Sequence, residues 1–216
     1  HGYPARADPR AEAGNWAGTP CHEIALRIAR IVGVDILLNV ALSSDQHLAA
    51  VFCGELNTAH LAGCRQVEEW ATARIDAPFD LVITSGGGAP LDASFYQSVK
   101  GLVAALPALD RESTLLQVSE CSQQLGSRAY TELMLRWGHD WRGRLAFLAA
   151  PPGEIALAQW ELRMHSRVLE RIGTEKLWFA SDGLPRDVER RIAIAPLPGP
   201  GSVAQRAQRA IDRFLA

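Results

Sequence analysis

The stretch DLVITSGGGAPLDASFYQSVKG, residues 80–101, decides the fold class of this chain. Its apolar start predicts a short buried strand, and the glycines at residues 86–88 predict a turn at the carboxyl end of that strand. Asp92, which could cap a helix, precedes a helical pattern with Gln97 and Lys100 in its early turns. Ligands of open α/β sheets bind beyond the carboxyl ends of the strands. The glycines therefore form either a binding site that a ligand approaches closely or a plain tight turn.

The predicted helix after the glycines has one apolar stripe and one polar pair. Gln97 and Lys100 are three residues apart, so they are neighbours on one helix face, roughly opposite the stripe. That face is either solvated or turned into a cleft, where an amide and an ammonium group would together hold a small carboxylate. The residues of the stripe are Phe95, Val99, Leu102, Val103 and Leu106.

Short apolar runs alternate with helical patterns throughout the rest of the chain. Before residue 75 the pattern predicts helices at 22–33 and 55–75 around two strands at 34–42 and 47–54. After residue 79 this alternation predicts an α/β domain of three layers with a mostly parallel sheet, preceded by the tail of a second α/β domain. Strands are expected at 79–85, 113–119, 144–150, 175–181 and 190–197, and helices at 92–109, 125–138, 153–173 and 202–215.

Composition narrows the class of protein. The chain has 216 residues and a formal net charge of −2, so charge gives no reason to expect binding to nucleic acid or to an anionic membrane. No apolar run reaches the roughly 18 residues that a membrane span needs. The four cysteines contain no CxxC pair and are interpreted as reduced thiols of a cytoplasmic protein. Cys121 is expected to be a small buried residue rather than a nucleophile.

Lysine is rare in this chain. Of the 22 basic residues only Lys100 and Lys176 are lysines. A lysine offers a compact point charge and an arginine a planar fork, so the two are not interchangeable. Lys100 is therefore a residue of interest in its own right.

The stretch at 80–101 resembles the carboxyl-terminal domain of the nickel-dependent lactate racemase family, in which a strand precedes a GG-x-P-x-D turn and a Y-Q-x-x-K helix. The likeness extends over nearly the whole chain, in order. DPRAEAGNWAGTPCHEIALRIARIVG resembles the family's G-x-x-x-G-x-P-x-x-E turn and A-R-x-x-G helix, and VFCGELNTAHLAGC resembles its F-x-G-x-x-x-x-A-H-x-x-G-C. SECSQQLGS resembles its E-C-x-x-G-x-G-S turn, and AQWELRMHSRVLER resembles its Q-W helix.

This resemblance implies a specific activity. Enzymes of the family interconvert the enantiomers of 2-hydroxy acids by hydride transfer at C2, with a nickel pincer nucleotide as cofactor. By position, Gln97 and Lys100 match the residues that hold the substrate, and Tyr96 and Trp160 would line the same pocket. No catalytic residue is expected within this chain.

The resemblance also implies that part of the protein is missing. Residues 1–77 match the end of the family's amino-terminal, cofactor-binding domain, and residues 78–216 match the carboxyl-terminal domain that carries the substrate-binding residues. The catalytic histidines, the lysine that bonds the cofactor and the phosphate loops would lie in the absent amino-terminal half. The cofactor would be bound mainly there, and the isolated chain is expected to be inactive. His1 falls near the position of a nickel ligand, and a neutral imidazole suits Ni²⁺.

Two positions depart from the family pattern. Ala89 stands where the family often has tyrosine, and Gln124 stands where it often has glycine. Both weaken an assignment of lactate itself as the substrate. His22 and His60 are interpreted as isolated structural residues, and His139 and His165 as surface or packing residues.

We predict a portion of a 2-hydroxy acid racemase or epimerase that acts on a small 2-hydroxy acid. Two alternatives remain: a non-catalytic α/β domain that keeps the carboxylate site, and a structural glycine turn whose resemblance marks only the fold. If the amino-terminal half is absent, residues 1–75 should carry apolar surface that it would cover.

Overall fold

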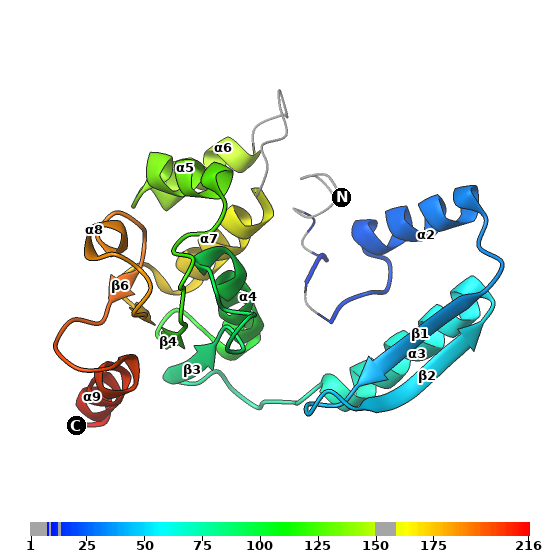
Figure 1. Cartoon of the computed structure of the whole chain (residues 1–216), viewed down its shortest axis with the longest axis horizontal. Coiled ribbons are helices and arrows are strands. Elements are labelled where there is room, and N and C mark those ends of the chain that lie inside the picture. The colour runs from blue at the N-terminus through cyan, green and yellow to red at the C-terminus, as the bar shows by residue number, and fades with distance from the viewer. Residues whose placement is uncertain (1–7, 9, 13, 150–158) are drawn as a thin grey trace. The chain divides into compact units, whose positions relative to one another are not determined.

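The computed structural model describes the chain except for residues 1–7, 9, 13 and 150–158. The chain divides into two compact units, residues 1–74 and 75–216 (Figure 1). The predicted nickel ligand His1 lies outside the described residues. The assignment of residues 1–77 to the family's amino-terminal domain stays a prediction.

The described part of the first unit is a hairpin with two helices. Helix α2 (Pro20–Val32) precedes the antiparallel strands β1 (Leu37–Leu42) and β2 (Leu48–Gly54), and helix α3 (Leu56–Ala71) follows them. Thr19 caps α2 by accepting the His22 N–H, and Pro20 occupies the first turn, where its missing N–H costs nothing. The predicted helices and strands of this part of the chain are confirmed, with ends that differ by a few residues.

Much of the apolar surface of the first unit is exposed. No residue of α2 is buried, although its isoleucines recur at helical spacing, and Ile28 and Ile31 are 56% and 76% exposed. Leu38 and Val40 of β1 alternate on one face of the hairpin and are 69% and 47% exposed. Side chains at this spacing normally face a packed core. The expected apolar surface is therefore present.

The second unit contains a parallel four-stranded sheet. Its strands are β3 (Leu81–Ser85), β4 (Thr114–Val118), β5 (Leu177–Ala180) and β6 (Ala195–Pro196), which lie side by side in that order. All three neighbouring pairs are parallel, which confirms the predicted sheet. The strand expected at 190–197 is much shorter than predicted, because only two of its residues join the ladder.

Helices cover both faces of this sheet, so the unit has three layers (Figure 1). Trp178 and Phe179 of β5 show the two faces directly. The Trp178 ring meets Phe214 of α9 at 6.0 Å, and the Phe179 ring meets Phe95 of α4 at 5.2 Å on the other side. The helices of the unit are α4 (Phe95–Ala105), the 3₁₀ turn η1 (Leu106–Ala108), α5 (Arg128–Trp137), α6 (Trp141–Ala149), α7 (Gln159–Ile172), α8 (Arg186–Glu189) and α9 (Val203–Leu215).

The strand predicted at residues 144–150 is wrong. Residues 141–149 form helix α6, in which Trp141, Arg144 and Leu148 are buried at spacings of three and four. This is the periodicity of one helix face, whereas a half-buried strand would bury every second residue. The run LAFLAA is short and uniformly apolar, and such a run does not distinguish a strand from a buried helix.

None of the helices in the described ranges combines the length and the apolar character that a membrane crossing requires.

Candidate functional site

The first turn of α4 is held by its neighbouring loop. The Phe95 N–H donates to the Gln124 carbonyl at 2.8 Å and the Tyr96 N–H to the Leu125 carbonyl at 3.3 Å. Ser94 caps the helix, since its hydroxyl accepts the Gln97 N–H. The helix terminus is therefore engaged by the protein itself. An anion bound here must be held by side chains on the flank of the helix, because the terminal amides already have partners.

Asp92 is not the helix cap that the sequence suggested. Its side chain is buried and its Oδ2 instead accepts the backbone N–H of Glu120 at 3.0 Å. The glycine turn packs directly on it, since a Cβ added at Gly86 would lie 2.5 Å from the Asp92 Cβ. Gly87 and Gly88 have φ of +95° and +75°, which favour glycine. The conformation and packing of the turn thus explain why glycine occupies all three positions. No ligand bound to the backbone is needed to explain them.

The polar pair on α4 is arranged as predicted. Phe95, Val99 and Leu102 are fully buried, whereas Gln97 is half-buried and Lys100 is exposed on the opposite side. The Lys100 Nζ donates a hydrogen bond to the Gln97 Oε1. This bond occupies the amide oxygen and leaves the amide NH₂ and the remaining ammonium protons as donors. Two adjacent donors, one of them charged, suit a carboxylate.

The other lysine of the chain has a structural role. The Lys176 Nζ donates to the Arg111 carbonyl at 2.7 Å and to the Glu112 carboxylate at 3.1 Å. Lys100, by contrast, is shown in contact with the neutral side chain of Gln97. The charge of Lys100 is thus in a position to meet an incoming anion, and Lys176 is a natural control for it.

Tyr96 and Trp160 lie on neighbouring helices. The Tyr96 ring packs edge-on against the buried Tyr130 at 5.1 Å, and both Tyr96 and Trp160 are half-buried. Trp160 is the second residue of α7, and α4 packs along α7. That Tyr96 and Trp160 share one substrate pocket with Gln97 and Lys100 stays a prediction.

The turn that follows β4 contains two residues in the left-handed backbone region. Cys121 has φ of +54° and Gln124 has φ of +53°. A glycine at position 124 would adopt this conformation freely, whereas for glutamine it costs about 1 kcal/mol. Cys121 is fully buried, as predicted, and burial raises the pKa of its thiol to about 11, so at neutral pH it is not a thiolate.

The structure brings together two histidines that the sequence treats as isolated. The rings of His22 on α2 and His60 on α3 stack at 5.2 Å, and the Cys64 Sγ lies 3.6 Å from the His60 Nε2. Neighbours on separate elements share no sequence spacing, so no pattern could have revealed this contact. His165 is a packing residue, as expected: burial and the nearby Arg144 hold its pKa well below the ordinary value.

The described residues do not form a nickel site. Within the ranges that the structure covers, no group of three or more His, Cys, Asp or Glu side chains could hold a metal ion.

Comparisons with known proteins point to one family. A model of the lactate racemase C-terminal domain matches residues 75–188. The lactate racemase of Thermoanaerobacterium thermosaccharolyticum is 31% identical over 166 residues, 75% of this chain and 38% of that protein. The lactate racemase of Lactiplantibacillus plantarum is 31% identical over 123 residues, 56% of this chain and 28% of that protein.

A solved structure is similar over almost the whole chain. The lactate racemase apoprotein from Thermoanaerobacterium thermosaccharolyticum matches with a TM-score of 0.84 and 26% identity, over 99% of this chain and 49% of the other. The chain thus spans less than half of the length of each of these relatives.

Proposed function

This chain belongs to the family of the lactate racemase C-terminal domain, and we propose that it forms the substrate-binding part of a 2-hydroxy acid racemase. The observation that carries the proposal is the Gln97–Lys100 pair, which presents two donors on the exposed flank of α4. Relatives named lactate racemase act on an acid whose carboxylate such a pair would hold.

The proposed role of the pair is to orient the substrate. The Lys100 ammonium would neutralise the carboxylate, and the Gln97 NH₂ would donate to its second oxygen. Two contacts fix the direction of the bond from the carboxyl carbon to C2, so that the reacting carbon has one position. Tyr96 and Trp160 would add apolar walls that exclude water from the reacting carbon.

The nickel pincer nucleotide is proposed to lie in the part of the protein that precedes this chain. When bound, it would exchange hydride with the substrate. The described residues offer no metal-ligand set, so we assign to them the binding of substrate and none of the cofactor's ligands. His1, which the resemblance places near a nickel ligand, lies outside the described residues and stays a prediction. The alternative function, a carboxylate-binding domain without catalysis, uses the same side chains and differs in lacking that partner.

Substrate binding can be tested on the chain by NMR titration with lactate. We expect the side-chain amide resonances of Gln97 to shift, since a bound carboxylate would accept from that group. Propane-1,2-diol, which keeps the hydroxyl and lacks the carboxylate, should leave them unchanged. Lys100→Ala should abolish the shifts and Lys176→Ala should retain them. Shifts that survive Lys100→Ala, or that the diol also produces, would rule out a carboxylate site at this pair.

We also propose that the apolar face of the first unit is covered by the amino-terminal part of the complete protein. We use the name apolar face for two exposed areas of this unit together: the stripe of α2, and one side of the hairpin, where Leu38 pairs with Cys53 across the strands. Large exposed apolar areas mark interaction surfaces. The relatives extend well beyond the region that this chain matches. The part of the complete protein that corresponds to this additional length is the proposed cover of the apolar face.

Alkylation of cysteine tests this second proposal. Cys53 is exposed on the hairpin and should react readily in the chain alone, whereas in the complete protein we expect its labelling to slow at least tenfold. Cys121 is buried with a raised thiol pKa and should resist labelling in both forms. Equal labelling of Cys53 in the two forms would show that the amino-terminal part does not cover the hairpin.

A further inference from the structure

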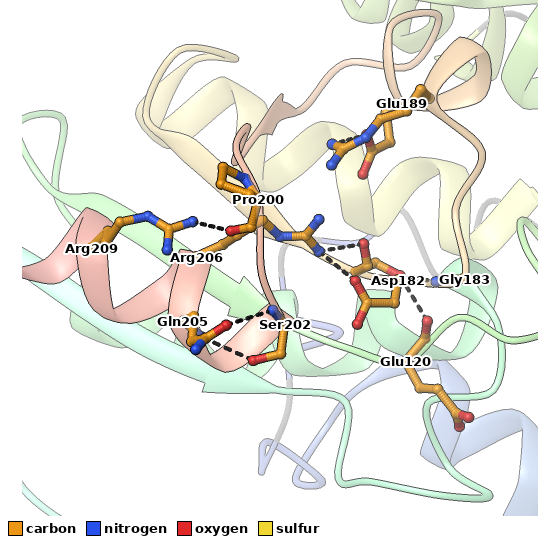
Figure 2. Close-up of polar contacts among 11 residues, drawn as sticks. Glu120, Asp182, Gly183, Glu189, Pro200, Ser202, Gln205, Arg206 and Arg209 are labelled. Carbon is orange, nitrogen blue, oxygen red and sulfur yellow. Dashed lines mark hydrogen bonds and ion pairs between the residues drawn. The ribbon is translucent and has the colours of Figure 1, made fainter.

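A continuous chain of hydrogen bonds joins the loops at the carboxyl edge of the parallel sheet. Arg206 of α9 is buried, and its Nη2 donates to the Ser181 carbonyl and to the Asp182 Oδ1, both at 2.8 Å (Figure 2). The Ser181 hydroxyl donates to the Glu120 carbonyl at 2.7 Å, and the Gly183 N–H donates to the same oxygen at 3.0 Å. Helix α9 thus fixes the loop after β5, and that loop fixes the loop after β4.

Asp92 extends this chain to the glycine turn after β3. Its Oδ2 accepts the Glu120 N–H at 3.0 Å, and its backbone carbonyl accepts the Cys121 N–H at 2.9 Å. Its own N–H donates to the Gly88 carbonyl at 3.1 Å. A buried carboxylate is costly unless its partners compensate, and among the described residues Oδ1 has no hydrogen-bond partner. Asp92 therefore joins the glycine turn after β3 to the loop after β4 through one buried side chain.

The loop that Asp92 holds also determines where α4 begins. The Gln123 N–H donates to the Ala93 carbonyl at 2.6 Å, and the first two amides of α4 donate to carbonyls of the same loop. Gln97 is the third residue of the helix, and Lys100 lies one turn further along. A shift of this loop would move both donors, and displacements of about 1 Å are enough to weaken a paired contact.

We propose that Asp92 is a positioning residue, which fixes the first turn of α4 so that Gln97 and Lys100 meet the substrate carboxylate together. The proposal rests on the carboxylate-binding role proposed for that pair. Asp92 itself need not touch the substrate, because its contacts lie within the loops. Its removal should therefore act through the pair and should have little further effect once the pair is broken.

A double-mutant cycle in the complete protein tests this dependence. Asp92→Ala should raise KM for the 2-hydroxy acid about tenfold in the parent background and less than about twofold in the Lys100→Ala background. Asp92→Asn should stay within about threefold of the parent, since an amide oxygen can still accept the Glu120 N–H. Ser127→Ala is the matched control: it removes the capping hydroxyl of α5, which accepts the Tyr130 N–H, and should lower Tm without changing KM.

The outcomes separate the positioning role from the carboxylate site. Equal KM changes for Asp92→Ala in both backgrounds, or a lowered Tm with normal KM as in Ser127→Ala, would overturn the positioning role and leave the site standing. A normal kcat/KM for Lys100→Ala alone would overturn both. If Asp92→Ala does not yield folded protein, Ser181→Ala decides in the same cycle. It removes the donor to the Glu120 carbonyl and should raise KM about threefold in the parent background only.

Discussion

Replacing Lys100 with alanine should lower kcat/KM for the 2-hydroxy acid by about one to two orders of magnitude in the complete protein. A charge-assisted hydrogen bond to a carboxylate is worth about 1.5–3 kcal/mol, which corresponds to that loss. The fold should be unaffected, because Lys100 is exposed and its contact in the structure is to Gln97. Steady-state kinetics together with the melting temperature give both quantities.

The other lysine and a conservative change sharpen this test. Lys176→Ala removes an equal charge from the same domain but breaks contacts to Arg111 and Glu112, so it should cost some stability and no activity. Lys100→Arg should restore activity only in part, since the guanidinium is longer and planar. Near-normal kinetics for Lys100→Ala at an unchanged melting temperature would show that this helix face is simply solvated.

The sequence predicts the parts of this structure that depend on local periodicity. The apolar stripe of α4 follows from spacing alone, because Phe95, Val99 and Leu102 recur at helical intervals and are fully buried. The opposite position of Gln97 and Lys100 follows from the same geometry. Periodicity does not distinguish the two structures at residues 144–150. No polar residue interrupts the apolar run there, so it fits a strand and a buried helix equally well.

The contacts that hold the candidate site in place could not be predicted. Asp92 fits a helix cap by residue type, yet Ser94 takes that role because it lies one residue before the helix. The carboxylate of Asp92 meets Glu120, 28 residues away, and no spacing rule pairs two such loops. The same holds for Arg206 and Ser181. These contacts exist because parallel strands bring their carboxyl ends to one edge of the sheet. The sequence predicts that the loops meet at this edge, but it does not predict which residues of those loops contact one another.

Gly101 is a position where a large loss of stability is expected. A Cβ added there would lie 2.2 Å from the Ser85 carbonyl oxygen and 3.0 Å from the Gln117 Nε2. The obstacle is backbone at the end of β3, so no side-chain rotation relieves the overlap and α4 must move away from the sheet. That movement breaks the hydrogen bond from the Gln117 Nε2 to the Ser98 carbonyl, now 2.8 Å, and loosens the buried stripe. Overpacking of this kind costs about 1–3 kcal/mol.

Gly101→Ala should therefore lower the free energy of unfolding by about 2 kcal/mol, even though alanine gains about 1 kcal/mol of helix propensity over glycine. Gly63→Ala in α3 is the matched control, because its new methyl would meet the adjustable ring of Phe52 at 3.2 Å rather than a carbonyl. We expect that variant to stay within about 1 kcal/mol of the parent in denaturant unfolding followed by near-UV circular dichroism. Equal stability of the two variants would mean that α4 does not need its close approach to β3. The position of Gln97 and Lys100 at the edge of the sheet would then require another explanation, because the glycine after Lys100 is what allows the helix to lie against Ser85.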